Sequence, residues 1–318
     1  MDMDASRHEK YDALIARCRS LPPIPTAVAH PCDASSLAGA VEAAGAGIVR
    51  PILVGPEAKI RLVARENDIA LSGIQIIDAA HSHAAAEKAV ELARTGEVAA
   101  LMKGSLHTDE LMAAVVRKDT GIRTQRRISH VFIMDVPTYP KPLFITDAAV
   151  NISPSLDDKA DIVANAIELA QALGVDTPKV AILSAVETVN AKIPSTIDAA
   201  ALCKMADRGQ IRGALLDGPL AFDNAISKEA AATKGIVSPV AGDADILLVP
   251  DLESGNMLAK ELTFLANADA AGIVLGARVP VILTSRADSV RTRLASCAVA
   301  AIYSHAVRIA AGLGKLVE

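Results

Sequence analysis

The feature that most constrains the fold is an alternation between short aliphatic runs and longer segments with helical periodicity. Each run consists mainly of Val, Ile, Leu and Ala, as buried strands do. The alternation predicts strands joined by crossover helices, and therefore an α/β fold with a mostly parallel sheet. We interpret as strands the runs 48–54, 74–77, 98–102, 131–136, 143–146, 180–183, 214–216, 246–249, 272–275 and 281–283.

The segments between the runs carry apolar residues at spacings of three and four, so each predicts a helix with one apolar face against the sheet. The clearest example has apolar residues at Ile162, Val163, Ala166, Ile167, Ala170 and Leu173. We expect Gly174 to end this helix, because glycine readily adopts the conformation that follows a helix.

One pair of runs departs from the alternation. The runs 131–136 and 143–146 are separated by a short segment that contains Pro137, Pro140 and Pro142. This segment is too short for a crossover helix, so we expect an antiparallel, hairpin-like pair near a domain junction.

Size and composition limit the class of protein. The chain has 318 residues, of which 51% are apolar, 22% charged and 2% aromatic. This length suits two globular domains with a cleft, and the core is expected to consist of Ala, Val, Leu and Ile. The net charge of -5 and the scattered basic residues leave no basic face for a nucleic acid or an anionic membrane.

Cysteine usage and the N-terminus bear on location. Cys18, Cys32, Cys203 and Cys297 are far apart and form no CxxC pair, as expected of reduced thiols rather than disulfides or a zinc site. The segment 1–19 is charged throughout, and no stretch approaches the roughly 20 apolar residues that span a bilayer. The sequence therefore predicts a cytoplasmic protein without a membrane partner.

The first candidate for chemistry is the segment 280–289, which predicts a buried strand, a polar turn and the start of a helix through Ala301. Ligands of open α/β folds bind at the carboxyl ends of strands, where helix N-termini favour anions. Arg286 adds a planar fork suited to phosphate oxygens. The alternative is that Ser285 or Asp288 only caps the helix and Arg286 is a solvated surface residue.

Three more polar turns follow predicted strands, around Lys103, Asp217 and Asn256. Lys103 is suited to hold a phosphate as a point charge, and Gly104 to let a ligand approach the backbone. Asp217 is suited to orient a group, and Asn256 to donate a hydrogen bond to a carbonyl or phosphate. Each is equally explained as an ordinary turn former.

The other motifs give weaker indications of a functional site. His81 and His83 form an HxH pair without an obvious third ligand, so we predict no metal site. His107 and His130 are interpreted as structural residues rather than bases. No GxGxxG, Walker or GxSxG pattern occurs where a dinucleotide site, P-loop or nucleophile elbow requires one.

Several long stretches resemble, in order, the phosphate acetyltransferase and phosphate butyryltransferase family, including the domain that is fused to enoyl-CoA hydratases in some members. The matching stretches are 103–112, 126–152, 183–196, 217–227, 238–258 and 284–289. The resemblance implies two α/β domains similar to the isocitrate dehydrogenase architecture, with a discontinuous first domain. We expect residues 1–145 and 285–318 to form that domain and residues 146–284 the inserted one; residues 1–97 are assigned by continuity.

The resemblance also implies an activity, the reversible transfer of an acyl group between CoA and inorganic phosphate. Ser285 and Arg286 match the Ser-Arg pair of the family. Acetyltransferase members place an Asp seven residues after this Ser, where the present chain has Thr292, and Asp288 is the nearest carboxylate. Asp288 is therefore a candidate base or a helix cap. The matching stretches further imply substrate contacts for Lys103, Ser105, His107, Ser129, Asp217, Gly255 and Asn256.

The expected partners are CoA, a short-chain acyl phosphate and phosphate, with CoA as substrate, no permanently bound cofactor and a homodimeric assembly. Acetyl transfer is the first hypothesis, and butyryl transfer is its alternative within the family. More remote alternatives are an NADP-dependent decarboxylating dehydrogenase and a non-catalytic CoA-binding protein.

Overall fold

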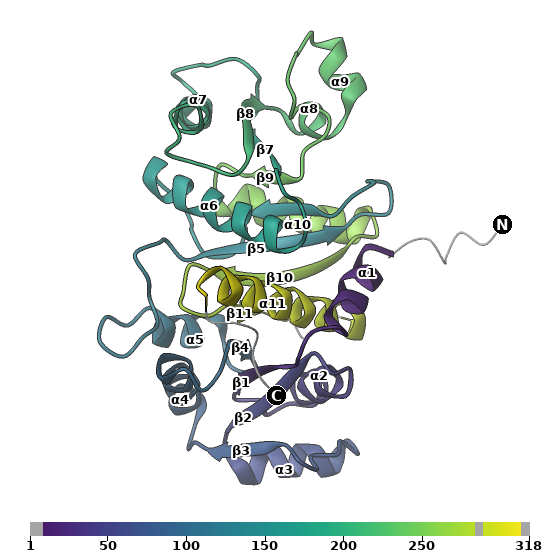
Figure 1. The fold of residues 1–318 in the computed structure, drawn as a ribbon, viewed down its shortest axis with the longest axis vertical. Coiled ribbons are helices and arrows are strands. Elements are labelled where there is room, and N and C mark those ends of the chain that lie inside the picture. Colours follow the sequence, from purple (N-terminus) through teal and green to yellow (C-terminus); the bar gives the residue numbers. More distant parts are fainter. Residues whose placement is uncertain (1–8, 284–288, 313–318) are drawn as a thin grey trace, which may run out of the picture. The chain divides into compact units, whose positions relative to one another are not determined.

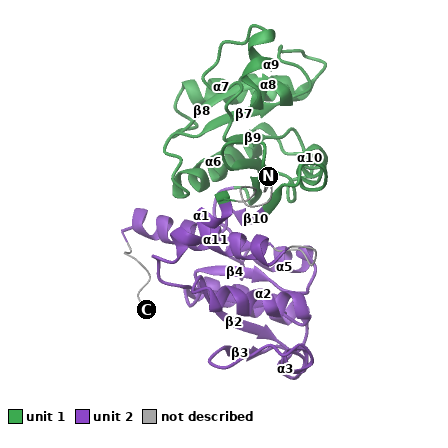
Figure 2. Cartoon of the chain, turned by 90° about the vertical axis from the view of Figure 1, so that its right-hand side faces the viewer, with its two compact units in different colours: residues 1–10, 127–270 green, residues 11–126, 271–318 purple. Residues whose placement is uncertain are grey.

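A computed structural model describes residues 9–283 and 289–312. The chain divides into two compact units, drawn in different colours in Figure 2. Unit 1 comprises residues 1–10 and 127–270, and unit 2 comprises residues 11–126 and 271–318. These divisions differ from the boundaries expected at 145/146 and 284/285, because the first strand of the antiparallel pair lies in unit 1 with its partner, and the strands after residue 271 pair within unit 2.

Unit 2 contains a mostly parallel sheet with the strand order β3-β2-β1-β4-β11-β10. All neighbouring pairs are parallel except β10 with β11. The strands are β1 (Ile24–Ala29), β2 (Val49–Gly55), β3 (Gln75–Asp78), β4 (Ala100–Lys103), β10 (Asp269–Leu275) and β11 (Val281–Ile282).

β1 was not predicted from the sequence, although this strand lies between β2 and β4 and is buried along its whole length. Pro22, Pro23 and Pro25 hid the signal, because proline lacks the N–H that a strand usually donates. Pro25 is nevertheless paired in register with Arg50, and its carbonyl accepts a hydrogen bond from Ala99 N at 2.8 Å.

The helices of unit 2 cover both faces of its sheet. Within unit 2, α4 packs beside α5, and α2 packs beside α11 on the other face (Figure 1). This division follows from right-handed crossovers, which change face when the strand order reverses direction. The helices are α1 (Glu9–Cys18), α2 (Ala34–Gly45), α3 (Glu57–Glu66), α4 (Ser82–Thr95), α5 (Thr108–Val115) and α11 (Val290–Ala310).

Unit 1 contains a sheet with the strand order β5-β6-β9-β7-β8. β5 and β6 are antiparallel and the remaining neighbours are parallel, which confirms the expected hairpin-like pair. The elements are β5 (Ser129–Asp135), β6 (Leu143–Thr146), α6 (Leu156–Ala172), β7 (Lys179–Leu183), α7 (Pro194–Asp207), β8 (Leu215–Leu220), α8 (Phe222–Ile226), α9 (Lys228–Thr233), β9 (Ile246–Leu248) and α10 (Leu252–Leu265).

Local sequence accounts for the ends of α6. Ser155 Oγ accepts a hydrogen bond from Asp158 N at 3.2 Å, and the Asp158 carboxylate accepts one from Ser155 N at 3.0 Å. This reciprocal pair is a capping box, which satisfies backbone donors at the start of a helix. At the other end Gly174 has a φ of 98°, so the expected glycine stop is confirmed.

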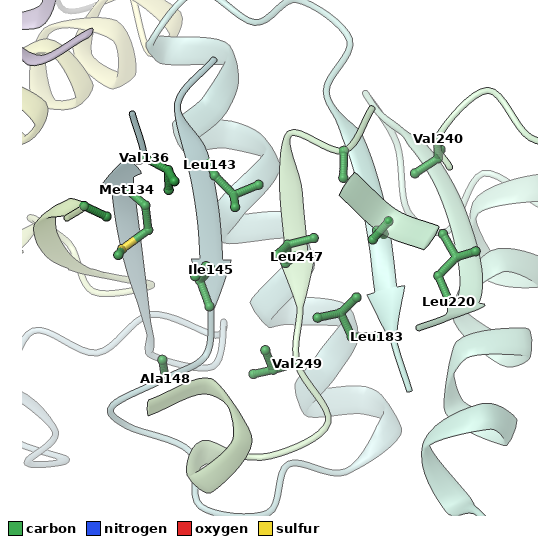
Figure 3. Packing of buried hydrophobic residues seen from close by; sticks show 14 residues of the cluster. Met134, Val136, Leu143, Ile145, Ala148, Leu183, Leu220, Val240, Leu247 and Val249 are labelled. Carbon is green, nitrogen blue, oxygen red and sulfur yellow. The ribbon is translucent and has the colours of Figure 1, made fainter. Parts of the chain in front are cut away.

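The core of unit 1 is almost entirely aliphatic, as its composition predicted. Figure 3 shows side chains from β6, β7 and β9 meeting over the sheet, among them Ile145, Leu183 and Leu247. Each of these three side chains is at least 90% buried. Among the residues with described positions, no helix combines the length and the apolar character needed to cross a membrane.

Candidate active site

The carboxyl ends of β1 and β4 form the most distinctive edge of unit 2. The chain runs from β1 outward through β2 to β3 and then returns to β4 on the other side of β1. Such a reversal of strand order leaves a crevice at the carboxyl ends, which is the usual ligand site of open α/β sheets. The N-termini of α2 and α5 follow these two strands directly. Helix dipoles favour negative charge at such ends, and carboxylates of the chain already occupy both: Ser36 N donates to Asp33 Oδ1 at 2.8 Å, and His107 N donates to Glu110 Oε2 at 3.1 Å.

Lys103 is the last residue of β4, so the turn predicted around it lies at the carboxyl end of this strand. The half-buried Lys103 Nζ donates a hydrogen bond to Gly104 O at 3.2 Å. The turn opens α5, as the sequence analysis expected. A lysine at this position supplies a positive charge suited to a phosphate.

Gly104 has a different role from the one expected. A Cβ at this position would lie 2.3 Å from Ala29 O and 2.6 Å from His30 C. Gly104 N also donates a hydrogen bond to Ala29 O at 2.9 Å. The absent side chain therefore makes room for the backbone after β1, whereas we had expected it to make room for a ligand.

Ser105 joins the loops that follow β1 and β4. Its Oγ donates to His30 O at 2.8 Å, accepts from Cys32 N at 3.3 Å and lies 3.1 Å from His30 Nδ1. His30 and Cys32 were not among the sequence-based candidates, because β1 was not recognised. A Ser105 substitution is therefore expected to disturb both loops.

His107 is exposed and immediately precedes α5. Its backbone N–H donates to Glu110 Oε2 at 3.1 Å, which satisfies one of the unpaired donors at the start of α5. The two histidines of the HxH pair are also engaged locally. His81 Nδ1 accepts a hydrogen bond from Ala84 N at the start of α4, and His83 Nδ1 lies 3.4 Å from Glu110 Oε1.

Ser285, Arg286 and Asp288 lie outside the described residues, but the elements on either side of them are described. β11 ends at Ile282, which pairs in parallel register with Met102 of β4. The N-cap of α11 is Ser289, whose Oγ accepts a hydrogen bond from Thr292 N at 3.1 Å. The N-cap position of α11 is therefore Ser289. The helix extends to Ala310 and not only to Ala301.

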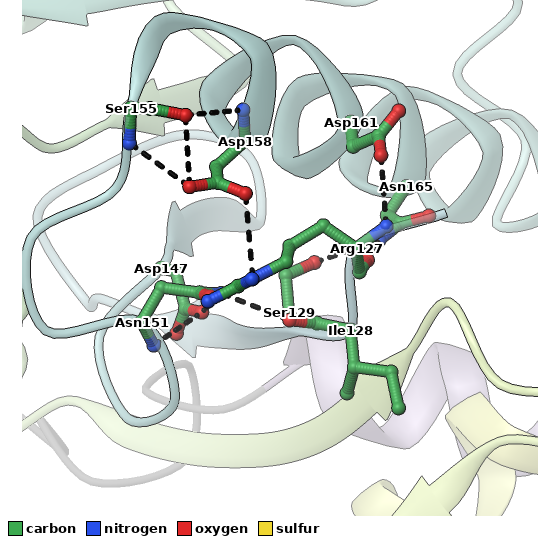
Figure 4. Close-up of polar contacts among 9 residues, drawn as sticks. All are labelled: Arg127, Ile128, Ser129, Asp147, Asn151, Ser155, Asp158, Asp161 and Asn165. Carbon is green, nitrogen blue, oxygen red and sulfur yellow. Dashed lines mark hydrogen bonds and ion pairs between the residues drawn. The ribbon is translucent and has the colours of Figure 1, made fainter. Parts of the chain in front are cut away.

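Ser129 belongs to a buried polar network of unit 1 (Figure 4). Asn165 Nδ2 donates to Ser129 Oγ at 2.8 Å and to Arg127 O at 2.9 Å. Arg127 Nε donates to Asn151 Oδ1 at 2.6 Å. Ser129 is fully buried, so these contacts tie the start of β5 to α6 and to the turn after β6.

Asp147 shapes the turn that follows β6. Its carboxylate accepts hydrogen bonds from the backbone N–H groups of Ala149, Val150 and Asn151 at 2.9, 3.0 and 3.1 Å. The side chain is almost completely buried. Several N–H donors compensate the cost of burying an ionised carboxylate, so the turn 147–151 has one preferred conformation.

Gly255 and Asn256 hold α10 against this turn. A Cβ on Gly255 would lie 2.7 Å from Val249 Cγ2 and 3.0 Å from Ala148 Cβ, and Asn256 Nδ2 donates to Ala148 O at 3.2 Å. Both residues lie within α10, whereas the sequence analysis placed them in a polar turn. The helix begins earlier because Asp251 caps it, accepting a hydrogen bond from Ser254 N at 2.8 Å.

Asp217 is also placed differently from the expectation. It lies inside β8, which extends to Leu220, and not in a turn after a strand. Pro219 is tolerated because β8 is an edge strand and leaves one side of its backbone unpaired. The half-buried Asp217 carboxylate accepts a hydrogen bond from Gly218 N at 2.9 Å.

Unit 1 also contains an apolar cavity that the sequence did not predict. Its volume is about 590 Å³, and it lies beyond the carboxyl ends of β7 and β9 against α10. Its walls include Leu183, Ser184, Phe222, Val249 and Leu262. None of the predicted site residues that the structure describes lines this cavity.

His130 is buried within β5 and stacks edge-on against Phe132. Burial lowers the pKa of His130, and the nearby Asp147 carboxylate opposes that shift only in part. The neutral imidazole is closed off from solvent, which agrees with a structural role. Among the described residues, no group of three or more His, Cys, Asp or Glu side chains is arranged to hold a metal ion.

These features define an α/β protein with a lysine-bearing turn at the carboxyl ends of parallel strands. A family model described as phosphate acetyl/butaryl transferase matches residues 83–301. The chain therefore belongs to this family and is an acyltransferase.

Individual relatives agree with the family. A phosphate acetyltransferase of Rhizobium meliloti is 69% identical over 93% of this chain and 93% of its own length. A phosphate butyryltransferase of Clostridium beijerinckii is 42% identical over 93% of this chain and 98% of its own length. The crystal structure of a branched-chain phosphotransacylase from Enterococcus faecalis V583 is 33% identical and covers 89% of this chain and 99% of that chain with a TM-score of 0.78.

Proposed function

We propose that this protein transfers an acetyl group reversibly between CoA and inorganic phosphate. The observation that carries the proposal is the similarity over nearly the whole chain to a phosphate acetyltransferase, at 69% identity. Lys103 at the carboxyl end of β4 supports it, because a lysine there supplies a positive charge suited to a phosphate group.

The chain's own groups have separate tasks in this reaction. Lys103 neutralises the phosphoryl oxygens. Arg286 adds a bidentate contact to them, and Ser285 binds beside the acyl carbonyl or the thiol. Alignment of the thiol with acetyl phosphate is worth about 7 kcal/mol or more of the barrier. We further propose that Asp288, Ser105, His107, Ser129, Asp217, Gly255 and Asn256 contact or support the substrates.

The first experiment mixes the purified protein with CoA and acetyl phosphate and follows thioester formation by ultraviolet absorbance. We expect turnover by the native chain and a large loss of kcat/KM in Arg286→Ala, with circular dichroism showing that the variant is folded. Absence of turnover with every short acyl phosphate would refute the proposal. Equal activity of Arg286→Ala would refute the role of Arg286.

The second candidate is butyryl transfer. The observation that favours it is the 42% identity to a phosphate butyryltransferase, together with the branched-chain phosphotransacylase among the similar structures. A pocket distinguishes substrates that differ by methylene groups by about 1–3 kcal/mol per methylene. The ratio of kcat/KM for acetyl-CoA and butyryl-CoA therefore decides between the two candidates.

We also propose that the protein is a cytoplasmic homodimer with CoA as a substrate and no permanently bound cofactor. The cysteines are free thiols, as expected of a reducing compartment. α10 presents Met257, Phe264 and Leu265 to solvent, and their exposed fractions are 64%, 80% and 82%. Clustered exposed apolar side chains often mark an interaction surface. Sedimentation of the native chain and of Phe264→Asp tests the dimer, since we expect the variant to dissociate.

A further inference from the structure

His30 is held in an unusual backbone conformation at the crevice between β1 and β4. It directly follows β1, whose Ala29 is paired in register with Lys103. Its φ is 55°, in the left-handed region that side chains other than glycine rarely adopt. His30 N donates to Val54 O at 2.7 Å and His30 O accepts from Ser105 N at 2.9 Å, so neighbours on both sides hold this backbone. Such a conformation persists where the surroundings impose it, often at functional sites.

The hydrogen bonds of Ser105 determine which ring nitrogen of His30 carries the proton. Ser105 Oγ has one proton, and it is donated to His30 O at 2.8 Å. With that proton engaged, the oxygen is suited to accept from His30 Nδ1 at 3.1 Å, and this arrangement favours the tautomer that carries its hydrogen on Nδ1. The neutral ring then keeps a lone pair on Nε2.

Nε2 is available to a substrate. Within the described part of the chain it makes no hydrogen bond, and it is not among the buried polar atoms that lack a partner. Nε2 is therefore accessible to solvent. Of the other described histidines, His130 and His305 are buried and His81 caps a helix. His83 and His107 are exposed, but neither has the left-handed backbone conformation of His30.

The charges around His30 keep it neutral at pH 7. Partial burial lowers the pKa of His30 below its ordinary value of 6.5, and Lys59 of α3 and His81 before α4 lower it further. Glu110 of α5 and Asp33 before α2 act in the opposite direction. A neutral imidazole is the form that accepts a proton.

The reaction needs such a group. A free thiol has a pKa of about 8.5, so only a few per cent is thiolate at pH 7. Thr292 offers no basic atom, because it is a buried hydroxyl that accepts a hydrogen bond from Ser289 Oγ at 3.1 Å.

We propose that His30 is the general base of the transfer and takes the thiol proton of CoA on Nε2. The inference rests on the proposed function. In the step toward the thioester, the S–H bond breaks and its proton moves to Nε2. The sulfur forms a bond to the acyl carbon, and the bond between that carbon and the phosphate oxygen breaks. The imidazolium then returns the proton to the departing phosphate or to water, and in the reverse direction the same imidazolium protonates the leaving thiolate.

The test compares the native chain with His30→Asn in the direction from acetyl phosphate to acetyl-CoA. Asparagine tolerates the left-handed conformation and keeps a donor for Ser105, but it has no basic nitrogen. We expect kcat to fall by about 10²–10⁴-fold with little change in either KM, and added imidazole to restore part of the rate. The native profile of kcat/KM should fall at acidic pH, and this acidic limb should be absent from His30→Asn. His83→Gln, an exposed control, should behave like the native chain.

Several results would overturn the inference. If the native chain is inactive, the proposed function fails and His30 fails with it. If the native chain is active and Arg286→Ala is impaired while His30→Asn retains kcat and the acidic limb, only the inference about His30 fails. If the acidic limb disappears in His107→Asn but persists in His30→Asn, the inference about His30 also fails. If His30→Asn does not fold, His30→Gly replaces it. If neither folds, the His30 pKa of the native chain, measured by NMR, must match the kinetic pKa, and a mismatch refutes the assignment.

Discussion

Gly104→Ala tests how tightly the crevice of unit 2 is built. The added Cβ would lie 2.3 Å from Ala29 O and 2.6 Å from both His30 C and His30 O. All three are backbone atoms, so no side chain can rotate away. The end of β4 would have to move by about 1 Å to reach an ordinary contact distance, and such overpacking typically costs about 1–3 kcal/mol. We expect a value near 3 kcal/mol, because the displaced groups also form the hydrogen bond from Gly104 N to Ala29 O.

The assay is thermal and urea unfolding followed by far-ultraviolet circular dichroism, with Gly45→Ala as the matched control. Gly45 lies at the end of α2, and a Cβ there would meet no atom within 4 Å. The control should therefore be neutral or slightly stabilising. Since about 1 kcal/mol shifts Tm by roughly 2–4 °C in a domain of 150–250 residues, Gly104→Ala should melt roughly 6–12 °C lower. The catalytic rate should also fall, because misplacement by about 1 Å can cost 10²-fold. A Tm equal to that of Gly45→Ala would refute this account of the crevice.

Two further predictions concern unit 1. Asn165→Ala leaves the buried Ser129 Oγ and the partly buried Arg127 carbonyl without their donor. The free energy of unfolding should therefore fall by about 1–3 kcal/mol, and an unchanged urea midpoint would contradict the network. Asp243 is bound by Lys179 Nζ at 2.5 Å and Lys141 Nζ at 3.0 Å, and the hydrogen bond from Lys179 is the main reason why its pKa falls from 3.8 to about 2. The ionised carboxylate stabilises the fold above pH 3.8, and this stabilisation is lost as the pH falls toward 2. The urea midpoint of Asp243→Asn should therefore depend less on pH in this window than that of the native chain, whereas the exposed control Asp119→Asn should match the native chain.

The local features of the fold were predictable because they depend on neighbours in the sequence. The spacing of apolar residues predicted α6, and Gly174 predicted its end. The antiparallel pairing of β5 with β6 followed from a connection too short for a helix. The strand and helix on either side of Ser285 were likewise foreseen.

Local signals failed where tertiary contacts outweighed them. Pro25 lies in a central strand and Pro219 in an edge strand, although the sequence favoured no strand at the first and a turn at the second. Gly255 was interpreted as part of a polar turn, but it is required by the close packing of α10 against Ala148 and Val249. These outcomes depend on which segments pair and pack, and single-residue preferences contain little of that information.

The sequence by itself determined the α/β fold class and the acyltransferase family of this protein. Both depend on local patterns, namely the alternation of strands and helices and the ordered motifs. Only the tertiary structure decided which residues meet. His30 and Ser105 are 75 residues apart and come together because β1 pairs with β4, an order that follows from long-range burial and not from either segment alone. The tertiary structure also placed the N-cap of α11 at Ser289. Strand order therefore places His30 beside Ser105, whereas the Ser285-Arg286 motif can be recognised from the sequence alone.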